Sequence, residues 1–118
     1  MLELIQRIIA FKYSAKLAHW QSTGYAHHLL CDRLQEGIDD IVDDVAEQYF
    51  MAGKQAGALS AAVLEPKYIT VDLAAAIKDI LATIDREIAT GKLSEGITSL
   101  VTDIASQFLG KLALVDLK

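Results

Sequence analysis

The spacing of the apolar residues constrains this chain more than any other feature. Apolar side chains recur every three or four residues along most of the sequence, and the only proline is Pro66. That period is typical of helices with one buried face, and a single proline leaves few points at which a helix must stop. The pattern therefore predicts an all-α protein. No linker or change of composition divides residues 1–118, so we expect one domain.

Glycines and capping residues divide the chain into four expected helices. These run from about Leu2 to Thr23, from Tyr25 to about Met51, from Thr70 as N-cap to a stop at Gly91, and from Ser94 as N-cap to about Val115. The second is expected to be one uninterrupted rod despite Gly37, because its apolar residues keep the helical period throughout.

The links between these helices predict the topology. The first and last are short, whereas the middle one extends from Gly53 to Thr70 and contains an Ala-rich piece, Ala58 to Leu64, that is expected to form a short helix. Short, long and short links are typical of an antiparallel four-helix bundle of the ferritin-like kind, in which a long crossover joins the second and third helices.

Composition excludes several classes of function. The net charge of −5 and the pI near 5.0 make nucleic acid an unlikely partner. Cys31 is the only cysteine and is expected to be a buried or half-buried thiol, so nothing indicates a disulfide-forming compartment. No stretch reaches the roughly 18 apolar residues that cross a bilayer. We therefore expect a soluble, cytoplasmic protein without a membrane segment.

A polar stripe on the second expected helix is the strongest functional signal. At about 100° per residue, one sector of a helical wheel holds His28, Asp32, Glu36, Asp39, Asp43 and Glu47. The apolar stripe lies on the other side, so these groups are expected to face outward. No Lys or Arg occurs in the stripe, and its acids repel one another unless a cation or a neighbouring subunit compensates. The simplest alternative is an acidic face in contact with water.

Carboxylates together with imidazoles make a mixed oxygen and nitrogen site, which suits Fe(II), Mn(II) or Zn(II) better than Ca(II) or Mg(II). A di-iron site inside a bundle needs Glu-x-x-His motifs, and no Glu lies three residues before any histidine of this chain. Outward ligands lose their water only where another chain covers them. The pattern therefore predicts a site between the subunits of a two-fold dimer, with His19 at the end of the first helix as a further ligand.

The segment His19-Trp20-Gln21-Ser22-Thr23-Gly24-Tyr25 resembles the His-Trp-Asn-x-x-Gly-x-x-Phe signature of the Dps-like miniferritins. In that family a second histidine is followed four positions later by Asp, as His28 is by Asp32. Eleven residues further on, the family's Asp-x-x-Ala-Glu-Arg is similar to the segment from Asp43 to Gln48. The resemblance covers about residues 15–50 in its motifs and the rest of the chain only in helix order.

The resemblance implies a ferroxidase that uses hydrogen peroxide or oxygen on Fe(II) and stores ferric iron in a hollow dodecamer. Its metal-binding and catalytic residues would be His19, His28, Asp32, Asp43 and Glu47. His19, Asp43 and Glu47 would come from one subunit, and His28 and Asp32 from its two-fold mate. Trp20 would be either a redox-active aromatic near the site or a core residue at a helix end.

The chain also departs from the family pattern. Its loop between His19 and His28 is three residues shorter, Gln48 replaces the usual Arg, and no basic tail is present, so DNA coating is not carried over. His27 is one residue off the matched register and is expected at the surface or behind a ligand. Two alternatives stay open: a ferritin-like helical assembly protein without turnover, and a purely structural bundle.

Overall fold

The computed structural model describes residues 1–51 and 64–116, and the described residues contain helices and no strand. The helices are α1 (Leu2–Gln21), α2 (Tyr25–Leu34), α3 (Ile38–Met51), the short 3₁₀ helix η1 (Pro66–Tyr68), α5 (Leu73–Ala89) and α6 (Glu95–Asp116). The all-α class predicted from the apolar period is therefore confirmed. No described helix has the length and apolar content needed to span a bilayer.

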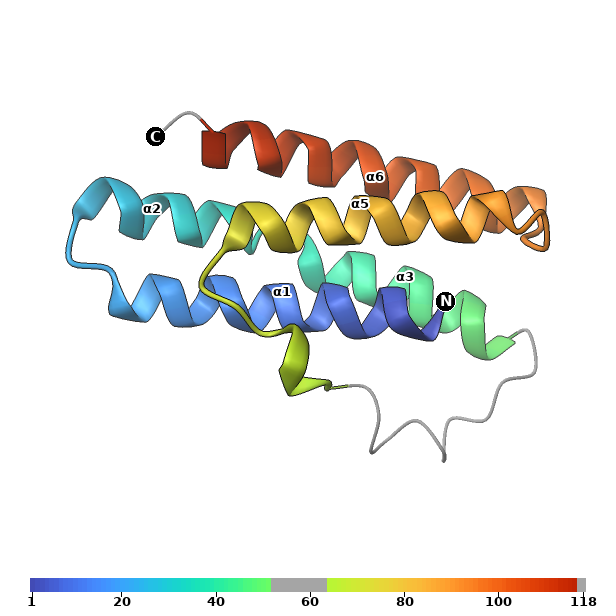
Figure 1. Ribbon diagram of the computed structural model, residues 1–118, viewed down its shortest axis with the longest axis horizontal. Helices are drawn as coiled ribbons and strands as arrows, with labels where there is room; N and C mark the ends of the chain where they lie inside the picture. Colours follow the sequence, from blue (N-terminus) through green and yellow to red (C-terminus); the bar gives the residue numbers. More distant parts are fainter. Residues whose placement is uncertain (52–63, 117–118) are drawn as a thin grey trace.

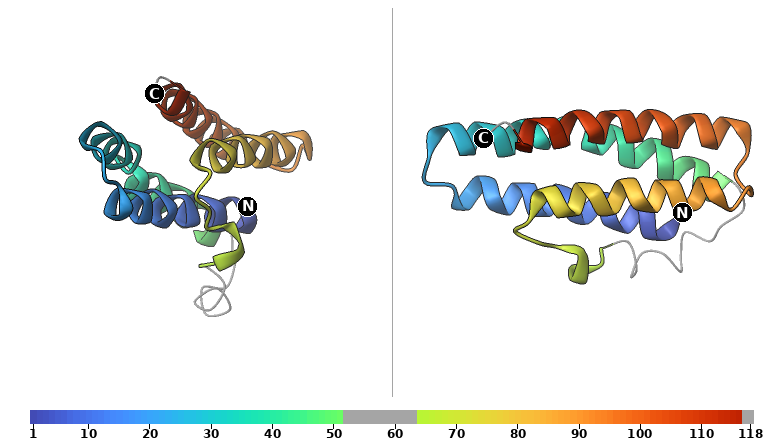
Figure 2. Two further views of the ribbon diagram at one scale, coloured as in Figure 1. Left: turned by 60° about the vertical axis from the view of Figure 1, so that its left-hand side comes forward. Right: turned by 45° about the horizontal axis from the view of Figure 1, so that its top comes forward.

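The helices form two layers that pack on each other (Figure 1). In one layer α1 lies beside α2 and α3, which follow one another along it in the opposite direction; the other layer is the α5–α6 hairpin. Contacts of α1 with α5, and of α2 and α3 with α6, join the layers. Figure 2 shows the same arrangement from two further directions. The molecule is therefore a four-rod helical bundle in which one rod consists of two helices.

The single rod expected from Tyr25 to Met51 is wrong, because the chain breaks between Leu34 and Ile38. Gly37 there has a φ of +76°, a left-handed conformation that glycine adopts without strain. The amides of Gln35 and Glu36 bond to carbonyls three residues back, which tightens the end of α2 before the break. The apolar stripe stays in phase across this break, and the spacing of apolar residues therefore gave no sign of it.

The caps of the last two helices agree only in part with the sequence. The Ser94 hydroxyl accepts a hydrogen bond from the Ile97 amide at 3.2 Å, so the predicted cap of α6 is confirmed. For α5 the N-cap is Asp72, whose carboxylate accepts from the Ala75 amide at 3.0 Å, rather than Thr70. The Thr70 hydroxyl instead accepts from the Asp72 amide, two residues before the cap is reached.

The core lies between the two layers, and a pair of aromatic rings marks its centre. Phe11 of α1 and Phe108 of α6 meet edge to face, with ring centroids 5.5 Å apart, and both are almost fully buried. Cys31 is also fully buried, as expected for a lone structural thiol. The contact between Phe11 and Phe108 joins α1 to α6, which are diagonal neighbours in the bundle.

The start of α5 is fixed against the middle of α1. The Thr70 amide donates to the Ser14 hydroxyl oxygen at 3.0 Å, and Ser14 in turn donates to the Ala10 carbonyl.

Figure 1 shows that α3 and α5 run in the same direction. The short helix expected from Ala58 to Leu64 lies outside the described residues, except for Leu64, which has no regular secondary structure.

The α1–α2 turn extends beyond the rest of the bundle. In Figures 1 and 2 the end of α1 and the start of α2 project past both the start of α5 and the end of α6. Side chains on this projecting end therefore have few neighbours from the second layer. Trp20 and Tyr25 lie on it and are 67% and 77% exposed. The predicted motif from His19 to His28 forms this projecting end.

Candidate metal site

Two of the expected ligands are in contact within one chain. The imidazole of His19, at the end of α1, stacks on that of His28 in α2, with ring centroids 3.8 Å apart and ring planes 28° from parallel. The Nδ1 atom of His19 lies 3.1 Å from the main-chain oxygen of His28. In return, the Nδ1 atom of His28 lies 3.1 Å from the main-chain oxygen of His19. The two histidines therefore close the turn reciprocally.

These hydrogen bonds fix the proton positions on both rings. A carbonyl oxygen only accepts, so each Nδ1 must carry the hydrogen that it donates. In the neutral ring the lone pair is then on Nε2, which is the nitrogen left to bind a cation. Each ring is half-buried and held by main chain, so its orientation is set before any ligand arrives. The geometry thus offers two pre-oriented imidazole donors whose ring centroids are 3.8 Å apart.

The acidic residues of the stripe are exposed, as the sequence predicted. The set consists of Asp32 on α2, Glu36 in the break, and Asp39, Asp43 and Glu47 on α3. We call this set the acidic ridge. One of its charges is compensated within the chain, because Lys12 of α1 pairs with Asp39 at 2.5 Å. The repulsion between the acids is therefore weaker than the sequence of the stripe alone predicted, because a lysine from another helix pairs with one of them.

The structure does not bring the five expected ligands together in one chain. The Lys12–Asp39 pair marks the level at which α1 and α3 face each other, and His19 lies seven residues beyond it in one direction while Asp43 lies four residues beyond it in the other. At 1.5 Å per residue these positions are roughly 16 Å apart along the bundle. His19 therefore cannot share an ion with Asp43 and Glu47 of its own chain, and the partition expected from the resemblance is wrong.

Among the described residues, no three His, Cys, Asp or Glu side chains are grouped closely enough to hold a metal ion. Asp32 lies one turn after His28 and is the acid of the ridge nearest in sequence to the histidine pair. The ligand positions of one chain thus form two separate groups. His19, His28 and Asp32 lie toward the projecting end, and Asp43 and Glu47 lie on α3.

Sequence reasoning missed a row of exposed apolar side chains beside the histidine pair. Tyr13, Leu17 and Trp20 follow the helical period on α1 and are 42%, 40% and 67% exposed; Tyr25 and Leu29 do the same on α2. We call these five residues the apolar row. Trp20 lies next to Lys16, whose Nζ is 5.9 Å from its ring centroid, so it is not the core residue that one interpretation expected. The signal was present, since α1 has apolar residues on every side.

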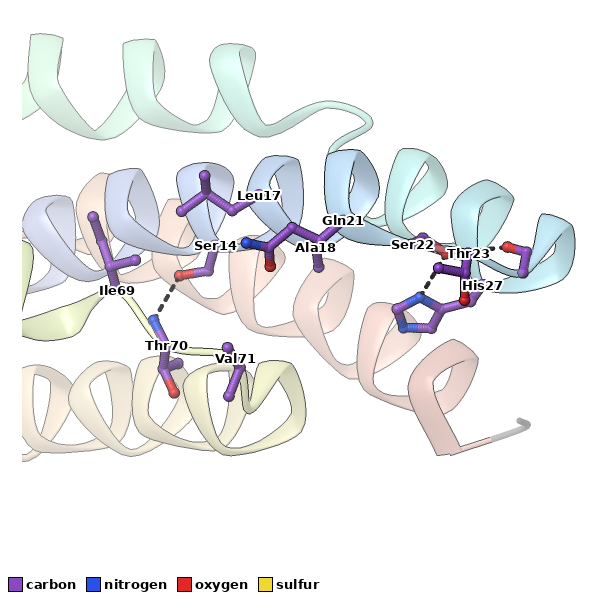
Figure 3. Close-up of a pocket in the computed structure, with 11 residues that line it drawn as sticks. Ser14, Leu17, Ala18, Gln21, Ser22, Thr23, His27, Ile69, Thr70 and Val71 are labelled. Atoms are coloured by element: carbon purple, nitrogen blue, oxygen red, sulfur yellow. Dashed lines mark hydrogen bonds between the residues drawn. The ribbon is translucent and has the colours of Figure 1, made fainter.

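His27 points to a different part of the molecule. It lines a pocket of about 540 Å³ between α1, the α1–α2 turn and the segment before α5 (Figure 3). Its Nδ1 donates to the Ser22 hydroxyl at 3.1 Å, Ser22 donates to the Gly24 carbonyl, and its ring contacts the Cys31 sulfur. These polar groups satisfy one another. Neither His19 nor His28 lines this pocket.

Comparison with known proteins gives the family of this chain. A model of a family of unknown function, DUF5856, matches residues 19–112, so the chain belongs to this family. The match begins at His19 and includes both groups of expected ligands. No curated protein matches the chain, and no solved structure matches it.

Proposed function

We propose that the protein is a Dps-like ferroxidase whose site forms between two copies of the chain. The observation that carries the proposal is the His19–His28 pair, whose Nδ1 atoms are held by main-chain carbonyls so that both Nε2 atoms remain as donors. The adjacent acidic ridge supplies oxygen ligands. Mixed imidazole and carboxylate donors suit Fe(II), Mn(II) or Zn(II), and the resemblance to the Dps-like miniferritins selects Fe(II) among them.

A two-fold axis at the α2–α3 break would complete the site. Asp32 lies five residues before Gly37, and Asp43 lies five residues after Ile38; His28 and Glu47 are each nine residues away from the same two positions. An axis through the Gly37–Ile38 peptide, perpendicular to the rods, therefore superposes the first group of ligands of one chain on the second group of the other. Each dimer would have two such sites.

The apolar row supports self-association of this kind. By the helical period Tyr13, Leu17 and Trp20 share one sector of α1, and Tyr25 and Leu29 share a sector of α2 with Asp32; the row and the acids of the ridge are exposed in the single chain. Large apolar side chains grouped on one face of a small protein mark an interaction surface. A dimer on this face would cover Tyr13, Leu17 and Trp20 and would also remove water from the acids.

The chemistry needs one oxidant from solution. Two Fe(II) ions give up one electron each, and the two electrons with two protons reduce one hydrogen peroxide to two waters, with Fe(III) as product. In this proposal the carboxylates of Asp32, Asp43 and Glu47 neutralise the charge of the iron, and His19 and His28 fix its position. A closed assembly of such dimers, like the dodecamer of the Dps-like miniferritins, would hold the ferric product.

The test is Fe(II) oxidation by the wild-type protein and by two single variants, His19→Ala and Glu47→Ala, followed by the absorbance of ferric iron. We expect both variants to lose most of the rate, because they remove one ligand from each group. The control is Asp44→Asn, which changes an exposed acid on α3 outside the stripe. Equal rates in all four proteins would refute the site.

An assembly protein without turnover is the second candidate, and the apolar row favours it because that row accounts for a dimer without any metal. Size under native conditions together with the oxidation rate distinguishes the two. A dimer that binds no iron supports assembly alone, whereas an assembly of about twelve chains that accumulates ferric iron supports storage.

A further inference from the structure

A buried lysine on the second layer reaches the break between α2 and α3. Lys111 of α6 is only 8% exposed, and its Nζ donates a hydrogen bond of 2.7 Å to the main-chain oxygen of Glu36. That oxygen lies in the break, where the regular hydrogen bonds of a helix are interrupted. Lys111 therefore satisfies a carbonyl that the bend leaves without its helical partner.

The surroundings of Lys111 make this contact specific to the bend. Burial lowers the pKa of Lys111, because removal of water disfavours the ammonium, while the Glu36 carboxylate acts in the opposite direction. A buried lysine is costly unless it is paired, and the Glu36 carbonyl supplies that partner. A cation at the end of α2 also interacts favourably with the helix dipole.

The sequence on either side of the break would also suit an unbroken helix. Its apolar stripe stays in phase from Cys31 to Val45, and a glycine inside a helix costs only about 1 kcal/mol relative to alanine. A straight helix through this segment would therefore keep the same apolar face. The side chain of Lys111 makes a hydrogen bond that depends on the bent form.

We propose that Lys111 is a positioning residue that holds the bend between α2 and α3, and with it the placement of the two ligand groups across the two-fold axis. The inference rests on the proposed function, because it is the axis at the Gly37–Ile38 peptide that makes the bend part of both sites. The bend turns the end that carries His28 and Asp32 relative to the end that carries Asp43 and Glu47. A change at the break therefore moves both sites of a dimer at once.

The bend itself is tested without metal. Spin labels are attached at Ala26→Cys on α2 and Asp44→Cys on α3, both exposed positions, in a Cys31→Ala background, and the labelled chain is diluted into excess unlabelled chain. Pulsed electron resonance then gives the distance distribution between α2 and α3. We expect Lys111→Met to shift or broaden the distribution, and Lys111→Arg to leave it close to that of wild type.

Two further variants guard against a simple loss of folding. Lys78→Met removes an exposed lysine from α5 and should change nothing. Gly37→Ala acts on the bend independently of Lys111: a Cβ there would meet nothing closer than the Gln107 side chain at 3.9 Å, so its effect comes from the φ of +76° alone. We expect Gly37→Ala to shift the distribution in the same sense as Lys111→Met.

The link to the site is tested with Co²⁺, titrated calorimetrically into the unlabelled proteins. We expect Lys111→Met to weaken Co²⁺ binding about tenfold or more, as loss of a residue that orients ligands usually does, and Lys111→Arg to restore most of the affinity. An unchanged distance distribution in Lys111→Met would overturn the inference, as would a shifted distribution with unchanged Co²⁺ affinity. A wild-type protein without Co²⁺ affinity would refute the proposed site. The spin-label distances between α2 and α3 would then test by themselves whether Lys111 holds the bend.

Discussion

The ring of His19 lies on the ring of His28, and each donates from Nδ1 to the main-chain oxygen of the other. This reciprocal contact joins α1 to α2 at the end of the bundle that projects beyond the second layer. Any account of the two histidines must therefore separate their part in stability from their part in binding.

Replacement of His19 by alanine or by asparagine makes this separation. His19→Ala removes one main-chain hydrogen bond and the stacking, and we expect it to lower the free energy of unfolding by about 1–2 kcal/mol. His19→Asn keeps an N–H donor near the position of Nδ1 and should recover part of that loss in urea titrations. Asparagine has no equivalent of Nε2, so both variants should lose iron oxidation. An active asparagine variant would contradict a ligand role for His19.

A charge in the apolar row should break the proposed dimer. Tyr13 is 42% exposed and lies near the level of the α2–α3 break, so a two-fold axis there brings it close to its own copy. Tyr13→Glu places two like charges at that point, and we expect the dissociation constant to rise about tenfold or more in sedimentation equilibrium. The matched control is Leu109→Glu, an exposed leucine on α6 in the other layer. Equal weakening by both variants would argue against this face.

The carboxylate of Glu3 should make stability depend on acid pH. Hydrogen bonds from Arg86 and Arg7 lower its pKa from 4.5 to about 2. The unfolded chain therefore binds the proton more readily, and the stabilisation is present above about pH 4.5 and is lost as the pH falls toward 2.

Glu3→Gln tests this dependence through thermal unfolding at several pH values. Glu3 is about one-third exposed, so screening by water reduces its contribution to about 1–2 kcal/mol. We expect the variant to unfold at lower temperature than wild type at pH 7 and at the same temperature near pH 2. Asp85→Asn, at an exposed acid of α5, serves as the control. A difference between Glu3→Gln and wild type that persists at pH 2 would show that charge is not its cause.

The contact between Phe11 and Phe108 should be the most costly to remove. Phe108→Ala leaves a cavity between the layers, and we expect the free energy of unfolding to fall by about 3–5 kcal/mol in urea titrations. The adjacent Leu109→Ala changes a side chain that is 55% exposed and should cost less than about 1 kcal/mol. Similar losses in the two variants would mean that the packing between α1 and α6 is not specific.

The apolar period and the capping residues determined the helical class, the outward direction of the acidic ridge and the burial of Cys31. These features depend on residues within a turn or two of each other, so a one-dimensional pattern carries them. The start of α6 at Ser94 is of the same kind, because the cap and the amide that it binds are three residues apart. The motif from His19 to Glu47 also predicted the candidate ligands.

Only the tertiary structure decided how those side chains are grouped. The carbonyl of Glu36, in the break at Gly37, accepts a hydrogen bond from Lys111, which is 75 residues away in sequence, and the ring of His19 stacks on that of His28 across the turn between two helices. The Lys12–Asp39 pair marks the register of α1 and α3 that separates His19 from Asp43. Each of these contacts joins residues from different helices. Their geometry is fixed by packing between helices, which the period within one helix does not record.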